Sequence, residues 1–356
     1  MLLLKLFFIP AFLAGFLTGK SILKRYGRPA DTPGLGFKIG LGLVGVFVAF
    51  VALAAFVRLT FDIEIYLPTF MRINATHFKW FGVELLFSAF VGFVYGVYYL
   101  EPRAMKIRLL ITVLILFAAI GCGENHYTRP IFDSCQDRRE NGIILQSYPS
   151  TCGPASLANL MMLFGKNVCE KDIARIARTR LTGTTGDELA IAARSEEFGM
   201  HARYFKVPLE MVEALGLPCV LSFGEVHFVT YIQRRGHLYE YIDPSTGLLM
   251  AKKNDLIREW DGKSLFVFDE KFDFRMTPGE SGREIIPIKK ALAKIYPGGG
   301  ETSEIKMDEI YDPGTAALVD RFRKDNPIAA GTGLEPYINL LILARASARK
   351  YFVTVK

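Results

Sequence analysis

The hydrophobic pattern divides the chain into two parts. Four long apolar stretches lie in its first third, at residues 2–19, 39–57, 81–100 and 105–121. Each is close to the roughly 20 residues that a helix needs to cross the hydrocarbon core of a membrane. After residue 122 the apolar residues recur at shorter, periodic spacings that are typical of a folded domain. The pattern predicts a transmembrane region of about four helices at residues 1–122.

Positive charges between the apolar stretches predict an orientation. The connection after the first stretch carries five cations, Lys20, Lys24, Arg25, Arg28 and Lys38. The short connection after the third stretch is also basic, whereas the one between the second and third is poorer in cations for its length. Because loops rich in lysine and arginine stay in the cytoplasm, we expect an integral, multi-pass membrane protein with the lipid bilayer as a partner. Both termini and the globular part would then lie on the extracytoplasmic side.

The globular part begins with helical periodicity and continues with strands. Apolar residues spaced three and four apart predict helices at 154–164, 168–178 and 188–198. Short apolar and alternating runs predict strands at 202–207, 219–223, 226–233, 238–242 and 265–268. Helices followed by an antiparallel sheet make an α+β domain, which we place at 123–272. Residues 273–356 form a C-terminal extension of unknown role, with a flexible linker at 297–300 and a helix at 334–353.

Composition and charge exclude several function classes. Apolar residues make up 51% of the chain, the mean hydropathy is +0.24, and the excess lies in the first third. Much of the net charge of +7 lies beside apolar segments, so we expect no nucleic-acid partner. Residues 14–21 resemble a phosphate-binding loop, but they end an apolar helix instead of following a strand. No nucleotide or other cofactor is therefore expected.

The cysteines argue against a metal site. The chain has five of them, Cys122, Cys135, Cys152, Cys169 and Cys219. None belongs to a Cys-x-x-Cys pair, so no structural zinc site is expected. Cys219 lies in an apolar strand and has the context of a small core residue. Cys135 and Cys169 could bridge in an oxidising compartment, a question that the sequence leaves open.

The segment at 146–157 carries the candidate nucleophile. It reads Gln-Ser-Tyr-Pro-Ser-Thr-Cys-Gly-Pro-Ala-Ser-Leu, and Pro154 suits the first turn of a helix. Cys152 would then lie beside the free N–H groups of a helix N-terminus, which stabilise a thiolate, as does a neighbouring imidazolium. The side-chain amide of Gln146 could form an oxyanion hole with the N–H of Cys152. Taken alone, Cys152 is also compatible with a structural role.

His227 and Asp243 complete the candidate set. His227 lies in an apolar strand, and Asp243 precedes a proline at a strand end. Each alone has a simpler interpretation, as a hydrogen-bonded core histidine and as a turn aspartate. Together, an amide, a thiol, an imidazole and a carboxylate in this order provide what acyl transfer by a cysteine nucleophile requires. The candidate catalytic residues are therefore Cys152, His227, Asp243 and Gln146.

These motifs resemble a known family. Residues 146–157, Phe164-Gly165, 183–186, 227–229 and 243–247 together resemble the C39 family of papain-like cysteine peptidases, over about residues 141–268. Its best-known members cleave leader peptides after a double glycine, usually as the N-terminal domain of ABC exporters. The resemblance implies a papain-like fold, with N-terminal helices packed on an antiparallel sheet.

The resemblance also implies a role for each candidate residue. Cys152 would be the nucleophile and His227 the general base and acid. Asp243 would orient the imidazole, and Gln146 would donate to the oxyanion.

The expected function is a membrane-anchored cysteine peptidase that acts on peptide or protein substrates. The peptidase-like part follows the apolar stretches, and the sequence shows no nucleotide-binding domain, so it departs from the exporter pattern. A separate ABC transporter is therefore a candidate partner. Two alternatives stay open. One is a non-hydrolytic C39-like module that binds peptides for a separate transporter. The other is a transpeptidase, which would use the same acyl-enzyme.

Overall fold

The computed structural model describes residues 8–26, 75–97, seven separate positions between 107 and 126, and 129–347 apart from 225, 298–304 and 327–332. Contacts between residues divide the chain into two compact units, Met1–Arg129 and Pro130–Lys356. The second unit contains every candidate catalytic residue.

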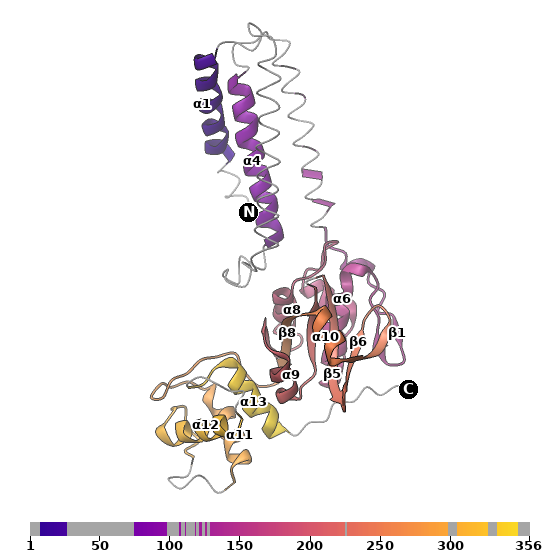
Figure 1. Cartoon of the computed structure of the whole chain (residues 1–356), viewed down its shortest axis with the longest axis vertical. Helices are drawn as coiled ribbons and strands as arrows, with labels where there is room; N and C mark the ends of the chain where they lie inside the picture. The colour runs from indigo at the N-terminus through magenta and orange to yellow at the C-terminus, as the bar shows by residue number, and fades with distance from the viewer. Residues whose placement is uncertain are drawn as a thin grey trace. The chain divides into compact units, whose positions relative to one another are not determined.

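The first unit contains two tightly packed helices, α1 (Phe8–Tyr26) and α4 (Ala75–Val97) (Figure 1). Glycines at the contact allow the two backbones to approach closely. A Cβ atom at Gly15 would lie 1.9 Å from the carbonyl oxygen of Ala89, and one at Gly92 would lie 2.0 Å from a carbonyl oxygen of α1. Since no side chain fits at such distances, the pairing of α1 with α4 depends on glycine at these positions.

The predicted membrane region is not supported. Among the residues that the structure describes, no helix is long and apolar enough to cross a membrane. Within α1, the cations Lys20, Lys24 and Arg25 interrupt the apolar run. The prediction of a multi-pass membrane protein is therefore wrong, and the extracytoplasmic placement derived from it falls too. The predicted stretch at 39–57 and most of 105–121 lie outside the described residues.

The second unit is built on an antiparallel sheet in the strand order β3-β8-β4-β5-β6-β7. Its strands are β3 (His201–Lys206), β4 (Cys219–Phe223), β5 (His227–Arg235), β6 (Leu238–Asp243), β7 (Gly247–Lys252) and β8 (Trp260–Phe268). The sequence analysis did not predict β7, whose exposed side chains lack a strict alternation. The three strands from β5 to β7 follow one another as a meander, which brings the start of β5 beside the end of β6.

Three helices precede the sheet and share a core with it: α6 (Cys152–Leu163), α7 (Glu170–Ile176) and α8 (Gly186–Ala193). Leu157 and Leu160 of α6 are fully buried against sheet residues such as Val220 and Leu265. Burial of leucine side chains of this size contributes roughly 1.5–3 kcal/mol each. The mixed helix and sheet arrangement confirms the predicted α+β class. A two-stranded ribbon, β1 (Arg139–Glu140) with β2 (Ile143–Ile144), lies before α6.

The C-terminal helices belong to the same unit as the sheet (Figure 1). They are α11 (Ile285–Ile295), α12 (Pro313–Asp325) and α13 (Pro336–Ser347), while the shorter α9 (Leu209–Leu215) and α10 (Lys253–Glu259) lie between strands. One hydrophobic cluster joins Val229 and Phe266 of the sheet to Ile288 and Leu341. The described helices of the extension predicted at 273–356 therefore pack on the domain, and a core is shared across residue 272.

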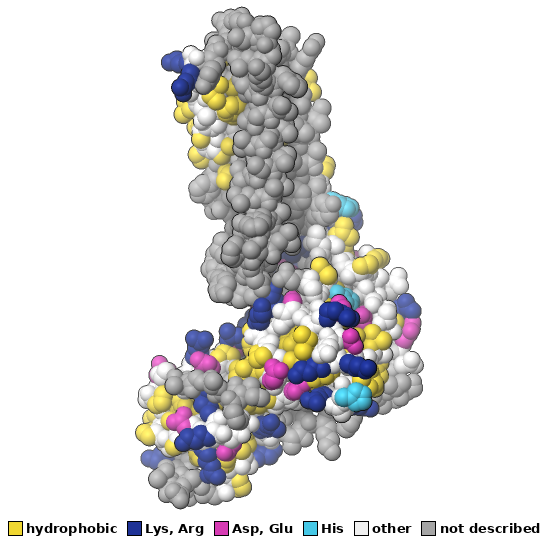
Figure 2. Space-filling view, in the orientation of Figure 1, with side chains coloured by type: hydrophobic (Ala, Val, Ile, Leu, Met, Phe, Trp, Pro, Cys, Tyr) yellow, Lys and Arg dark blue, Asp and Glu magenta, His cyan; other side chains and the backbone are white. Residues whose placement is uncertain are grey.

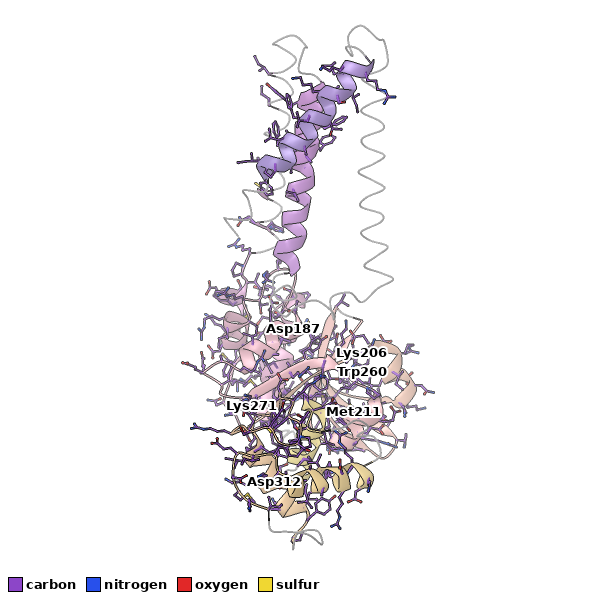
Figure 3. All side chains as sticks on the ribbon, turned by 90° about the vertical axis from the view of Figure 1, so that its left-hand side faces the viewer. Asp187, Lys206, Met211, Trp260, Lys271 and Asp312 are labelled. Carbon is purple, nitrogen blue, oxygen red and sulfur yellow. The ribbon has the colours of Figure 1, made fainter. Side chains whose placement is uncertain are left out.

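Polar anchors hold this C-terminal part in place. The Nδ2 atom of buried Asn339 donates to the carbonyl oxygens of Phe272 and Phe274, at 3.0 Å each. The side chain of Lys289 is 0% exposed, and its Nζ donates to Asp308 at 2.6 Å and to Asp312 at 2.8 Å. Asp312 is labelled in Figure 3, among the C-terminal helices. An ammonium group buried this deeply needs such partners, because an unpaired charge would be costly.

The surface of the second unit mixes charges of both signs. Figure 2 shows Lys and Arg side chains interspersed with Asp and Glu on the visible face. Exposed ion pairs such as Lys253–Glu210 and Arg258–Asp255 contribute roughly 0–1 kcal/mol each. Stability therefore rests on the shared core and on its few buried polar anchors.

Candidate active site

The structure places Cys152 as the first residue of α6, after the 3₁₀ turn η4 (Pro149–Thr151). The hydroxyl of Thr151 accepts from the N–H of Tyr148 at 3.0 Å and closes this turn. The residue after the cysteine is packed tightly, since a Cβ at Gly153 would lie 3.1 Å from a methyl carbon of Leu189. Cys152 is buried, and the turn and the packing behind it fix where its thiol points.

His227 and Asp243 meet because their strands are neighbours. His227 begins β5, Asp243 ends β6, and the two strands pair antiparallel. Nε2 of His227 lies 3.1 Å from Oδ1 of Asp243. The same carboxylate oxygen accepts from the backbone N–H of Ser245 at 2.8 Å and from its hydroxyl at 2.6 Å. The turn after β6 therefore holds the carboxylate in position for the imidazole.

The side chain of Cys152 also acts on the imidazole and raises the pKa of His227. Because Nε2 of His227 is bonded to Asp243, Nδ1 is the ring nitrogen that remains for the Cys152 thiol. The hydrogen bond to Asp243 is the largest cause of the raised pKa, the interaction with Cys152 follows, and burial opposes them; the result is a pKa of about 9. The imidazolium form is thus favoured at neutral pH.

Burial disfavours ionisation of Asp243, but the hydrogen bonds from His227 and Ser245 outweigh it and lower the pKa of this carboxyl group. Each of the two opposite charges, the carboxylate of Asp243 and the imidazolium of His227, favours the charged form of the other.

Two hydroxyl groups fasten the helix of the thiol to the strand of the imidazole. The hydroxyl of Ser156 donates to the carbonyl oxygen of Phe228, and that of Thr230 donates to the carbonyl oxygen of Ser156, both at 2.8 Å. Ser156 and Thr230 are fully buried. The sequence analysis missed both residues, although a serine on the apolar face of a predicted helix is a signal that could have pointed to one of them.

Gln146 lies next to the turn that carries Asp243. Its backbone N–H donates to the carbonyl oxygen of Pro244 at 2.8 Å. Its side-chain Oε1 is buried and has no hydrogen-bond partner among the described residues. The structure thus brings the segment of Gln146 to the Asp243–Pro244 turn, while its role as an oxyanion donor stays a prediction.

All five cysteines are free thiols in the structure, so Cys135 and Cys169 are not bridged. Burial, with a smaller contribution from Glu170, raises the pKa of Cys135 to about 12. Burial also raises the pKa of Cys219, which lies in β4. No imidazole is among the groups that shift the pKa of either of these two buried cysteines. In the described part of the chain, no group of three or more His, Cys, Asp or Glu side chains could hold a metal ion.

Comparison with known proteins identifies the domain. The model of the peptidase C39 family matches residues 140–271. The chain is 30% identical over 166 residues to a probable microcin-H47 secretion/processing ATP-binding protein, MchF, of Escherichia coli. It is 30% identical over 125 residues to an uncharacterized protein of Methanothermobacter thermautotrophicus. The first match covers 45% of this chain and 23% of the relative, and the second covers 35% and 87%.

Solved structures similar to the chain include two peptidase domains. A double glycine motif protease from an AMS/PCAT transporter, in complex with a leader peptide, is 24% identical, with a TM-score of 0.33 over 35% of this chain and 89% of that one. The peptidase domain of Streptococcus ComA, a bi-functional ABC transporter, is 20% identical, with a TM-score of 0.33 over 36% and 98%. By its match to the family model, this chain contains a domain of the peptidase C39 family, a family of cysteine peptidases.

Proposed function

We propose that the C39 domain is an active cysteine peptidase with Cys152 as its nucleophile. The observation that carries the proposal is the position of His227, whose imidazole is hydrogen-bonded to Asp243 and whose pKa is raised by the side chain of Cys152. In such a chain of groups, the carboxylate orients the ring and the ring exchanges a proton with the thiol. The raised pKa of His227 supports an ion pair between thiolate and imidazolium.

The reaction follows from these positions. The Cys152 thiolate attacks the carbonyl carbon of the scissile bond, and the oxyanion accepts from the backbone N–H of Cys152 and from the amide of Gln146. The imidazolium of His227 gives its proton to the leaving amine, and a thioester forms. Neutral His227 then takes a proton from water, whose oxygen attacks the thioester and releases the product acid. Asp243 stays ionised and holds the ring throughout.

The substrates we propose are peptides or proteins. The two Escherichia coli relatives are described by name as secretion/processing ATP-binding proteins, MchF and CvaB. The chain covers 23% of each, so their whole activity does not transfer. We propose that a separate ABC transporter is the partner of this chain, and that a peptide with a double-glycine leader is the first substrate to try.

The first test measures the reactivity of Cys152. The rate of alkylation by iodoacetamide is followed against pH in the full-length protein and in His227→Ala. We expect faster alkylation of Cys152 at neutral pH in the protein with His227 than in the variant, because a neighbouring imidazolium stabilises the thiolate. An ordinary thiol profile that the substitution leaves unchanged would favour a non-hydrolytic peptide-binding module.

The second test measures turnover. Peptides with and without a double-glycine leader are incubated with wild-type protein and with Cys152→Ala, and the products are identified by mass spectrometry. Cleavage that persists in Cys152→Ala would refute the assignment of the nucleophile. Added amines separate the two outcomes of the acyl-enzyme, because a transpeptidase would transfer the acyl group to the amine instead of to water.

A further inference from the structure

The segment that carries Gln146 is anchored to three different elements. The backbone N–H and carbonyl of Ile144 are both bonded to the side-chain amide of Asn159 on α6, at 2.8 Å each. Gln146 is bonded through its N–H to Pro244, at the end of β6. The third anchor is Glu170, the first residue of α7, which binds Ser147.

Glu170 holds Ser147 through both of its carboxylate oxygens. Oε1 accepts from the backbone N–H of Ser147 at 2.8 Å, and Oε2 accepts from its hydroxyl. The Ser147 hydroxyl in turn accepts from the N–H of Gln136 at 2.8 Å. The Glu170 residue is 0% exposed, and its own N–H donates to Asp137 at 3.1 Å. Burying a carboxylate costs free energy unless hydrogen bonds compensate. For Glu170 the compensating bonds come from Ser147, the residue next to Gln146.

We propose that Glu170 is a positioning residue for the peptidase reaction: by fixing Ser147, it sets the direction of the Gln146 amide toward the oxyanion. This inference rests on the proposed function and deepens it. A donor contributes to oxyanion stabilisation only at about 2.7–3.1 Å from the developing charge. Because Ser147 follows Gln146 directly, a shift of Ser147 changes the backbone from which the Gln146 side chain extends.

Position 170 requires two acceptor oxygens, which glutamate provides, and a variant can test this requirement. Ser147 presents two donors to residue 170, its N–H and its O–H. A glutamine there has the same shape but only one oxygen, so its NH₂ group would face one of the donors. Glu170→Gln should therefore weaken the hydrogen bonds that hold Ser147 while a side chain of the same size still fills the position. Glu196→Gln is the matched control, since Glu196 is exposed and makes none of these contacts.

The experiment compares two reactions of the same thiol in the full-length protein. Alkylation by iodoacetamide forms an S–C bond with loss of iodide and involves no oxyanion. Acylation by p-nitrophenyl acetate forms a thioester through an oxyanion and expels p-nitrophenolate. For Glu170→Gln we expect acylation to slow by about 10-fold or more, since a displacement of about 1 Å can cost 100-fold, while alkylation keeps its wild-type rate and pH profile. Glu196→Gln should match wild type in both reactions.

A double variant separates positioning from a general structural effect. In a Gln146→Ala background, Glu170→Gln should cause no further loss of acylation, because the amide that it positions is gone. Ser147→Ala, which keeps the carboxylate buried and removes the hydroxyl's bonds to Glu170 and from Gln136, should slow acylation in the same direction, and it provides the test if Glu170→Gln does not fold. Circular dichroism and thermal melts check the fold of each variant.

The outcomes distinguish the inference from the proposed function. If His227→Ala leaves the alkylation rate of Cys152 unchanged, the proposed function fails and the inference fails with it. If wild-type Cys152 is reactive but Glu170→Gln acylates at the wild-type rate, only the inference is overturned. The inference alone is also overturned if Glu170→Gln slows acylation by the same factor in the wild-type and the Gln146→Ala backgrounds.

Discussion

The imidazole of His227 lies between a thiol and a carboxylate, and these two neighbours set its charge. Its raised pKa of about 9 means that the protonated ring is stabilised in the folded protein relative to the unfolded chain. The stability contributed by this proton is fully present below the ordinary histidine pKa of about 6.5 and is lost as the pH rises through about 9. In the proposed mechanism, the same proton goes to the leaving amine.

The first prediction concerns the pH dependence of cleavage. The kcat/KM for an amide substrate should fall above a pKa of about 9, where His227 loses its proton. Alkylation of Cys152 should not fall there, since it needs only the thiolate. In Asp243→Asn the alkaline limb should move to lower pH, because the largest cause of the raised pKa is reduced. Alkaline limbs at the same pH in wild type and Asp243→Asn would contradict this account.

Sequence reasoning located the chemistry of these residues but not the contacts that hold them. Cys152 was expected at a helix start and Asp243 at a strand end, and both are found there. These positions follow from local signals, namely a proline in the first helical turn and a proline after a strand. The bond from Thr230 to Ser156 joins residues 74 positions apart. No local pattern encodes such a pairing.

At the scale of elements, the hydroxyl bonds between α6 and β5 are what hold the thiol and the imidazole at a constant separation. The second prediction removes one of them. Thr230→Val keeps the shape but leaves the buried carbonyl of Ser156 without this donor, which should lower the free energy of unfolding by about 1–3 kcal/mol. Urea denaturation gives the value, and Thr246→Val in the exposed turn after β6 is the control. Equal stability of both variants would show that the bond contributes nothing.

The third prediction concerns the pair α1 and α4. Gly15→Ala places a Cβ 1.9 Å from the backbone oxygen of Ala89, so the helices must separate. Gly121→Ala is the matched control, because no atom lies within 4 Å of its added Cβ. Limited proteolysis of full-length protein should cut the first unit faster in Gly15→Ala than in Gly121→Ala. Identical cleavage rates would show that the close approach of the two helices is not needed.

For the whole molecule, the notable feature is that the family domain and the C-terminal helices share one core. Val229 and Phe266 of the sheet belong to the same buried cluster as Ile288 and Leu341. A chain ending at residue 272 would expose this apolar surface to water, so we expect it to aggregate or to unfold more easily than the chain with its C-terminal helices. The boundary predicted at residue 272 lies next to the end of the family match at residue 271, and the buried core continues beyond it.

The fourth prediction tests the buried ammonium group that stabilises this C-terminal part. Lys289→Met keeps the apolar stem but leaves Asp308 and Asp312 without their cation, and we expect a loss of about 2 kcal/mol, since both carboxylates are partly exposed. Lys290→Met, at the exposed neighbouring position, is the control. Burial opposes ionisation of Asp312, but the Lys289 and Thr315 hydrogen bonds prevail and lower its pKa to about 2.

The pH dependence of that variant follows from the same shift. A lowered carboxyl pKa contributes stability that is present above the unfolded value of about 3.9 and is lost as the pH falls through about 2. The difference in stability between wild type and Lys289→Met should therefore shrink between about pH 4 and pH 2. Thermal melts across this range measure it. A difference in stability that stays constant between about pH 4 and pH 2 would mean that the ion pair of Lys289 with Asp312 does not account for the effect of the substitution.

The membrane prediction failed for an identifiable reason. Apolar stretches near 20 residues long were interpreted as spans from their length, yet α1 is interrupted by cations toward its C-terminal end. The average hydropathy of a stretch measures how apolar it is. It does not predict which residues the helix contains. In the structure the helix continues through Lys20, Lys24 and Arg25, so the cations are part of it.

By itself, the sequence determined the α+β class and the local setting of the candidate residues, because helix starts, strand alternation and turns depend on neighbours in the chain. Tertiary structure alone decided that Asp243 reaches His227, that Glu170 binds Ser147 and that the C-terminal helices complete the core. Each of these depends on strand register and helix packing, which bring together residues that are distant in sequence.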